Sequence, residues 1–245
     1  MGSRPPATQG EHIAEAATRL CQVRAEFCAI PATISRADGT VRSTRGPRTM
    51  SSSRRLSQAI SEGDGISLLV PVRDIAAARA AEDDGAEGVV VSHAVAGLRE
   101  ATGLPVLVRS DDRSALVRAD ADACVLRVGD LSGDWDRLRD LYREAEAHGV
   151  EPVIGVKDDD ELELALEHVD PEIVLLAPPS PDADEDLLES VLDLLPDVPA
   201  GKLAIAEVAV RTREHVAALE RAGVDAVIVT SGDIAAFVGG PTPEV

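Results

Sequence analysis

Residues 151–168 read EPVIGVKDDDELELALEH. The apolar run 152–156 has the length and the branched side chains of a buried strand. Lys157 follows this run at once, and residues 159–168 then carry apolar side chains at the three-to-four spacing of one helix face. The stretch therefore predicts a strand, a loop that begins with a cation, and a helix that packs back on the strand.

The same strand-and-helix pattern continues on both sides of this stretch. Apolar runs of strand length lie at 67–72, 88–92, 105–109, 122–127, 152–156, 172–177, 203–208 and 225–230. Helical patterns lie at 74–84, 134–147, 159–168, 184–195 and 211–222, and glycines end several of them. Strands that are apolar throughout indicate a parallel sheet buried on both faces. Eight such units predict an α/β fold, a compact (β/α)8 TIM barrel. An open flavodoxin-like or Rossmann sheet is the alternative, although no G-x-G-x-x-G or Walker A pattern follows any of the runs.

The first 49 residues differ from the rest in charge and in pattern. They hold seven arginines and four acids, a net charge of +3, whereas the remainder has a net charge of −23. We expect a basic and largely disordered tail over 1–49, with a short amphipathic helix at 11–29. We expect the barrel to occupy 50–245 and to begin with a short helix within 51–62. Met50 is an alternative start of the protein.

The composition excludes several classes of partner. A net charge of −20 argues against nucleic acid and anionic membranes as partners. Such acidity with only two lysines is typical of proteins from a high-salt cytoplasm, and an ordinary acidic protein from a GC-rich genome is the alternative. The spacing of Cys21, Cys28 and Cys124 indicates neither a disulfide framework nor a zinc site. Because there is no 18-residue apolar run and no continuous apolar core near the N-terminus, we expect a cytoplasmic protein. We also expect no metal and no cofactor. The oligomeric state is left open.

Cations recur just after the predicted strands, although the chain has 24 Lys and Arg against 44 Asp and Glu. They are Arg73, Arg109, Arg127 and Lys157, after strands one, three, four and five. The other polar candidates near strand ends are His93, Ser180, Thr230, Ser231 and Gly232. In a barrel, the C-terminal ends of the strands surround one opening, so these residues predict a site for an anionic small molecule. We expect phosphate at the last loop, where backbone N–H groups bind it. The alternative is that the charges are solvated loop residues.

Three residues are candidates for catalysis. Lys157 in a mouth flanked by arginines would have a lowered pKa, as acid–base or imine chemistry requires; alternatively it is a surface lysine that pairs with Asp159 or Asp160. Glu207 ends a strand as a base, an orienting group or an ion-pair partner of a rim cation. Arg109 completes the catalytic set.

Residues 66–240 resemble the indole-3-glycerol phosphate synthase family, a family of phosphate-binding barrels. The segments that carry the likeness are Gly103–Asp111, Pro152–Leu166, Ile205–Glu207 with Thr212–Val216, and Ala222–Ala226. The resemblance implies a carbon–carbon lyase of tryptophan biosynthesis that closes an indole ring with decarboxylation and dehydration.

This chain departs from that family at most of the catalytic positions. Pro71 and Arg73 stand where the family has Glu-x-Lys on the first strand, and Arg109 stands in place of the catalytic lysine. Gly155 replaces the glutamate of strand five. Residues 177–182 replace an Asn-Asn-Arg region, and Val208 and Ala209 replace a Ser-Gly pair. Glu207 is retained. We therefore expect a lyase or isomerase with altered chemistry, or a catalytically inactive ligand-binding or scaffold homologue. A further hypothesis has the basic tail docking on the acidic barrel of a neighbour.

Overall fold

The computed structural model describes residues 55–63, 65–109, 120–131, 133–178, 184–210, 212–229 and 237. They belong to one compact unit, Ser51–Val245. The predicted tail over 1–49, its helix at 11–29 and the start at Met50 lie outside the described residues. The boundary between tail and barrel therefore stays a prediction.

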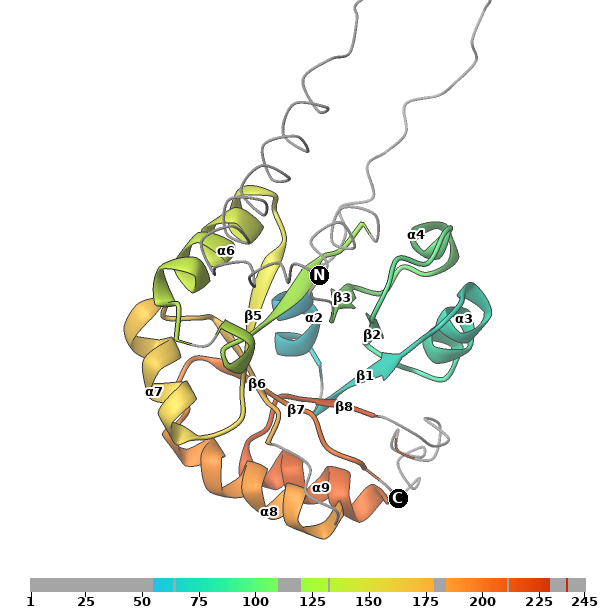
Figure 1. The fold of residues 1–245 in the computed structure, drawn as a ribbon. Helices are drawn as coiled ribbons and strands as arrows, with labels where there is room; N and C mark the ends of the chain where they lie inside the picture. The colour runs from blue at the N-terminus through green and yellow to red at the C-terminus, as the bar shows by residue number, and fades with distance from the viewer. Residues whose placement is uncertain are drawn as a thin grey trace, which may run out of the picture. The chain divides into compact units, whose positions relative to one another are not determined.

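The strands form a closed parallel barrel in which each strand pairs with its neighbours in chain order and the last pairs with the first (Figure 1). The strands are β1 (Ser67–Pro71), β2 (Gly88–Val91), β3 (Val106–Val108), β4 (Ala123–Arg127), β5 (Glu151–Val156), β6 (Ile173–Leu176), β7 (Leu203–Ala206) and β8 (Ala226–Ile228). The predicted barrel is confirmed, and the open-sheet alternative is wrong.

Helices cover the outside of the strands, and one short helix overlaps the centre of their ring in the view of Figure 1. The bounds are α2 (Leu56–Ser61), α3 (Ile75–Asp83), α4 (Leu98–Ala101), α6 (Trp135–Ala147), α7 (Asp159–His168), α8 (Asp184–Leu194) and α9 (Arg213–Ala222). Short 3₁₀ turns lie at Gly129–Leu131 and Leu195–Asp197. Among the α-helices of the described residues, the sequence pattern missed only α4, which has four residues.

Side-chain caps explain where several of these helices begin. The carboxylates of Asp74, Asp134 and Asp158 accept hydrogen bonds from the amide three residues later, at 2.8, 3.0 and 2.9 Å. Each cap satisfies an amide that has no partner inside its helix and contributes about 1 kcal/mol. At the other end of α9, Gly223 adopts φ = 100°, a left-handed conformation that favours glycine.

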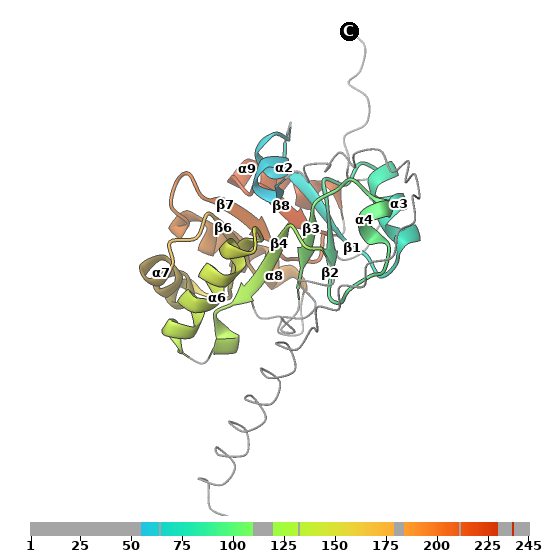
Figure 2. The same cartoon turned by 90° about the horizontal axis from the view of Figure 1, so that it is seen from above.

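The interior of the barrel is an apolar cluster with at least one member from each strand. Its members on the strands are Leu69, Val90, Leu107, Ala123, Val125, Val153, Ile173, Leu175, Ile205, Ala226 and Ile228. Leu56 and Ile60 of α2 belong to the same cluster, so α2 packs into the end of the barrel where the strands begin (Figure 2). Ser57 of α2 donates from its amide and hydroxyl to the Glu151 carboxylate at the start of β5, at 3.1 and 2.5 Å. This end of the barrel is therefore closed by the chain itself.

A second apolar cluster lies between the strands and the outer helices. Helices α4, α6, α7 and α9 contribute Leu98, Leu138, Leu162 and Leu219, each at most 1% exposed. Burying a leucine contributes about 1.5–3 kcal/mol, so aliphatic packing stabilises the barrel although aromatic residues make up only 2% of the chain.

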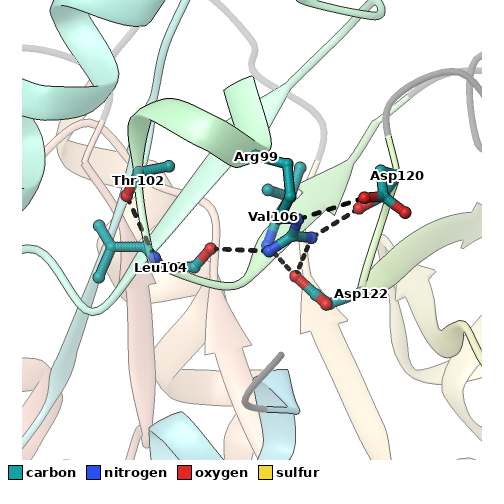
Figure 3. A network of polar contacts seen from close by, with 6 residues as sticks. All are labelled: Arg99, Thr102, Leu104, Val106, Asp120 and Asp122. Carbon is teal, nitrogen blue, oxygen red and sulfur yellow. Dashed lines mark hydrogen bonds and ion pairs between the residues drawn. The ribbon is translucent and has the colours of Figure 1, made fainter. Parts of the chain in front are cut away.

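Polar contacts join β3 to the segment that enters β4, again at the end where the strands begin. Figure 3 shows the Asp122 carboxylate between the amide of Val106 and the guanidinium of Arg99, at 2.7 and 2.6 Å. Arg99 also donates to the carbonyls of Asp120 and Leu104, at 2.6 and 3.4 Å. The Asp122 carboxylate thus fixes the register of β4 against β3.

Candidate functional site

Strand geometry determines which side chains reach the other end of the barrel. Side chains alternate between the two faces of a strand, so the residue two positions after an interior one also faces inward. Leu107, Val125 and Ile205 are interior. Arg109 and Glu207, which directly follow β3 and β7, and Arg127, the last residue of β4, therefore point over the C-terminal opening of the barrel, which we call the mouth.

In the mouth these three side chains form one ion-pair cluster. An Arg109 guanidinium nitrogen lies 2.5 Å from one carboxylate oxygen of Glu207. A guanidinium nitrogen of Arg127 donates to the other oxygen at 2.8 Å. Each oxygen of a single carboxylate is thus held by a different arginine.

The charges of the cluster do not cancel. Two guanidinium groups and one carboxylate give a formal charge of +1, because arginine remains protonated in proteins. The side chains of Arg109 and Arg127 are 28% and 35% exposed, and that of Glu207 is 16% exposed. The arginines therefore keep contact with solvent and have donors to offer an anion.

Small residues on β5 and beside β6 make room for this contact across the barrel. Gly155 pairs with Arg127 in the strand register. A Cβ atom on Gly155 would lie 3.2 Å from Cγ of Arg127 and 3.4 Å from a methyl group of Val125. Ala177, directly after β6, packs against the interior cluster. The absence of a side chain at 155 thus lets Arg127 lie over β5 and extend toward Glu207.

Lys157 belongs to another ion pair at the start of α7. Its ammonium group lies 2.7 Å from Glu161 and 3.8 Å from Asp158, and its side chain is 49% exposed. The hydrogen bond and charge of Glu161 raise the pKa of Lys157 above its ordinary value. The expectation that neighbouring arginines lower this pKa is therefore wrong. The pairing resembles the surface-lysine alternative, although the partners are Glu161 and Asp158 rather than Asp159 or Asp160.

Glu161 is a buried acid that the sequence pattern did not single out. It is 9% exposed, and besides Lys157 Nζ it accepts the backbone amide of Lys157 at 3.1 Å. Its own amide donates to Asp158, the N-cap of α7, at 2.9 Å. A glutamate at the third position of a helix commonly reaches back to the cap, and that spacing could have identified it.

The remaining candidates take no part in the described cluster. Arg73 and His93 are exposed in the loops after β1 and β2. Ser180, Thr230, Ser231 and Gly232 lie outside the described residues, so the expected phosphate contact at the last loop stays a prediction.

The described residues contain neither a metal-binding cluster nor a membrane-spanning helix. No group of three or more His, Cys, Asp or Glu residues in the described part of the chain lies close enough to hold a metal ion. No helix within the described ranges has the length and apolar character that crossing a membrane requires.

Comparison with known proteins adds a family assignment to this geometry. A family model described as indole-3-glycerol phosphate synthase matches residues 113–234, a range that includes Arg127, Gly155 and Glu207. An indole-3-glycerol phosphate synthase of Variovorax paradoxus (strain S110) is 35% identical over 109 residues, which are 44% of this chain and 40% of that protein. The chain thus spans less than half the length of that relative.

A solved structure supports the fold. The N-acetylmannosamine-6-phosphate 2-epimerase from Clostridium perfringens aligns with a TM-score of 0.52 and 16% identity, over 69% of this chain and 88% of that one. At this identity the likeness shows the barrel fold alone.

Proposed function

The chain belongs to the indole-3-glycerol phosphate synthase family, and from that premise we propose that its barrel binds a phosphorylated or carboxylated small molecule in the mouth. Arg109 and Arg127 are the proposed anion-binding residues. Arg73, His93 and the loops that contain Ser180 and Thr230–Gly232 are proposed to contact the rest of the ligand.

One observation carries the proposal: two guanidinium groups from neighbouring strands converge on a single carboxylate in the mouth. Guanidinium groups bind carboxylates and phosphates through paired, charge-assisted hydrogen bonds. The two arginines outnumber Glu207, their acidic partner in the cluster, so one positive charge is left for a ligand. The site therefore suits a ligand that carries an anionic group.

Catalysis is the second candidate function, and Glu207 favours it. A carboxylate in the mouth is placed to accept a proton or to orient a reacting group, as a carbon–carbon lyase or isomerase requires. Arg109 is a poor general acid because it stays protonated. Lys157, with a raised pKa and two acidic partners, is a weaker candidate for acid–base or imine chemistry than the sequence alone predicted. Ligand binding without turnover, as in a sensor or scaffold, is therefore the version of the proposal that the geometry supports best.

A thermal-shift screen of phosphorylated and carboxylated metabolites tests the binding proposal. A ligand present at about 100 times its dissociation constant stabilises the protein by about 2.7 kcal/mol, and we expect this gain to disappear in the Arg109→Gln/Arg127→Gln double variant. Arg79→Gln on α3 removes an exposed arginine outside the mouth and is the matched control. Hits that stabilise the double variant as much as the wild type would refute the proposal.

Growth of a tryptophan auxotroph that lacks the synthase tests the lyase proposal. If the chain catalyses ring closure, it restores growth and Glu207→Gln abolishes that growth. Expression of a folded protein without growth excludes ring closure and leaves altered lyase or isomerase chemistry and ligand binding as the remaining proposals.

The proposed setting is a cytoplasm, with high salt as the finer proposal. Salt screens repulsion among like charges, so an acidic chain adapted to it gains stability as KCl rises. A melting temperature that does not rise between 0.1 M and 2 M KCl would remove the high-salt proposal.

A further inference from the structure

Glu207 holds a position that the proposed ligand also needs. In the described cluster its two carboxylate oxygens contact Arg109 at 2.5 Å and Arg127 at 2.8 Å. A ligand carboxylate bound by the same two arginines would make the same pair of contacts. We infer that Glu207 is an internal competitor, a tethered anion that occupies the arginine pair until a ligand replaces it. This inference rests on the proposed anion site.

The topology explains why the carboxylate is tethered across the mouth rather than beside the arginines. The sheet order separates β7 from β4 by β5 and β6. The inward positions on that path are Gly155 and Ala177, which have no side chain or only a methyl group. Glu207 and Arg127 therefore meet across a stretch of the rim that larger side chains would fill.

The contacts are also of a kind that a ligand can exchange. The arginine side chains are about one third exposed, at 28% and 35%. Ion pairs open to water contribute little net stability because solvent replaces the lost partner. An incoming anion can thus replace Glu207 without leaving a buried guanidinium unpaired, which would be costly. The Glu207 side chain is 16% exposed, so its carboxylate must turn toward solvent when it is displaced.

An internal competitor makes the mouth selective. An inorganic anion makes the same kind of contacts with the two arginines as the Glu207 carboxylate. Because Glu207 is part of the same chain, it competes at a high effective concentration. A ligand that adds contacts with other parts of the mouth overcomes this competition. Glu207 is then a specificity-determining residue that excludes ambient anions.

The test is calorimetric titration of sulfate at constant ionic strength. Glu207→Gln keeps the shape of the side chain and removes its charge. We expect sulfate to bind about tenfold more tightly to this variant than to the wild type, a gain of about 1.4 kcal/mol. The gain should disappear when Arg109→Gln and Arg127→Gln are added. Glu163→Gln, at an exposed position on α7, changes the net charge equally and should leave sulfate binding unchanged.

The outcomes separate this inference from the proposed function. Arginine-dependent sulfate binding that is equal or weaker in Glu207→Gln overturns the inference and leaves the anion site intact. No arginine-dependent binding in any variant overturns the anion site itself. If Glu207→Gln does not fold, Glu207→Asp keeps the charge but withdraws it by one methylene, and unchanged sulfate affinity in that folded variant likewise overturns the inference.

Discussion

Replacing Asp122 by alanine should destabilise the barrel by about 3 kcal/mol. Asp122 is 8% exposed, and its carboxylate accepts the amide of Val106, a residue with no exposed surface, at 2.7 Å. Leaving a buried amide without an acceptor costs about 1–3 kcal/mol. The lost hydrogen bond from Arg99 adds about 1 kcal/mol, discounted because that side chain is 24% exposed and can be rehydrated.

Two further variants separate these contributions. Asp122→Asn keeps an acceptor for the amide, and we expect a loss of about 1 kcal/mol. Asp225 accepts the amide of Ala204 at 2.7 Å, so it joins β8 to β7 as Asp122 joins β4 to β3. Asp225→Ala should destabilise the barrel by about 2 kcal/mol, because it leaves the Ala204 amide without its acceptor.

Urea unfolding measures these differences. The chain has one tryptophan, Trp135, whose fluorescence can be followed together with circular dichroism. We expect the midpoint to fall while the slope with denaturant stays constant, since the same surface becomes exposed. A loss below about 1 kcal/mol for Asp122→Ala, or equal losses for Asp122→Ala and Asp122→Asn, would refute the assigned role of the carboxylate.

Three further predictions concern other parts of the barrel. Gly155→Val should push Arg127 aside, because even a Cβ atom would lie 3.2 Å from its Cγ. In the Glu207→Gln background, where the arginine pair is open to inorganic anions, we expect it to weaken phosphate binding about tenfold, or 1.4 kcal/mol; equal calorimetric affinities with and without Gly155→Val would contradict this. Burial raises the pKa of Cys124 to about 12. In a variant with the two N-terminal cysteines replaced by serine, disulfide-exchange reagents should therefore react with Cys124 only at the rate of unfolding. A fast reaction of the folded protein would contradict the burial of this thiol. Lys157 has a raised pKa, so its contribution to stability should be complete below its unfolded pKa and be lost as pH rises through the higher folded pKa. Lys157→Met should thus melt below the wild type at pH 8 and converge with it at strongly alkaline pH, and a difference that persists there would show that the ammonium charge is not the cause.

The sequence alone predicted the scaffold well, because buried parallel strands leave a strong signal. The run 152–156 and the helix 159–168 correspond to β5 and α7 within one residue. Helix α4 was missed, since four residues are too few to show a period. Long helices and apolar strands are therefore the elements that such patterns can locate.

The site was predicted less well, because pairing across a barrel leaves no local pattern. The position of Glu207 after an apolar strand identified it as a candidate. Its simultaneous contact with Arg109 and Arg127, the latter 80 residues away, follows only from the closed sheet. The direction of the Lys157 pKa shift was wrong because the decisive partner, Glu161, lies one helical turn later rather than in the mouth.

The most direct test of the arginine pair as an anion site is a titration of the ¹⁵N-labelled Glu207→Gln variant, which lacks the competing carboxylate, with inorganic phosphate. The side-chain Nε–Hε resonances of Arg109 and Arg127 can be assigned from the two Arg→Gln variants. We expect both resonances to shift together and to saturate with one dissociation constant, while the resonance of Arg79, exposed on α3, does not shift. Unchanged resonances at Arg109 and Arg127, or an equal shift at Arg79, would contradict the proposed anion site.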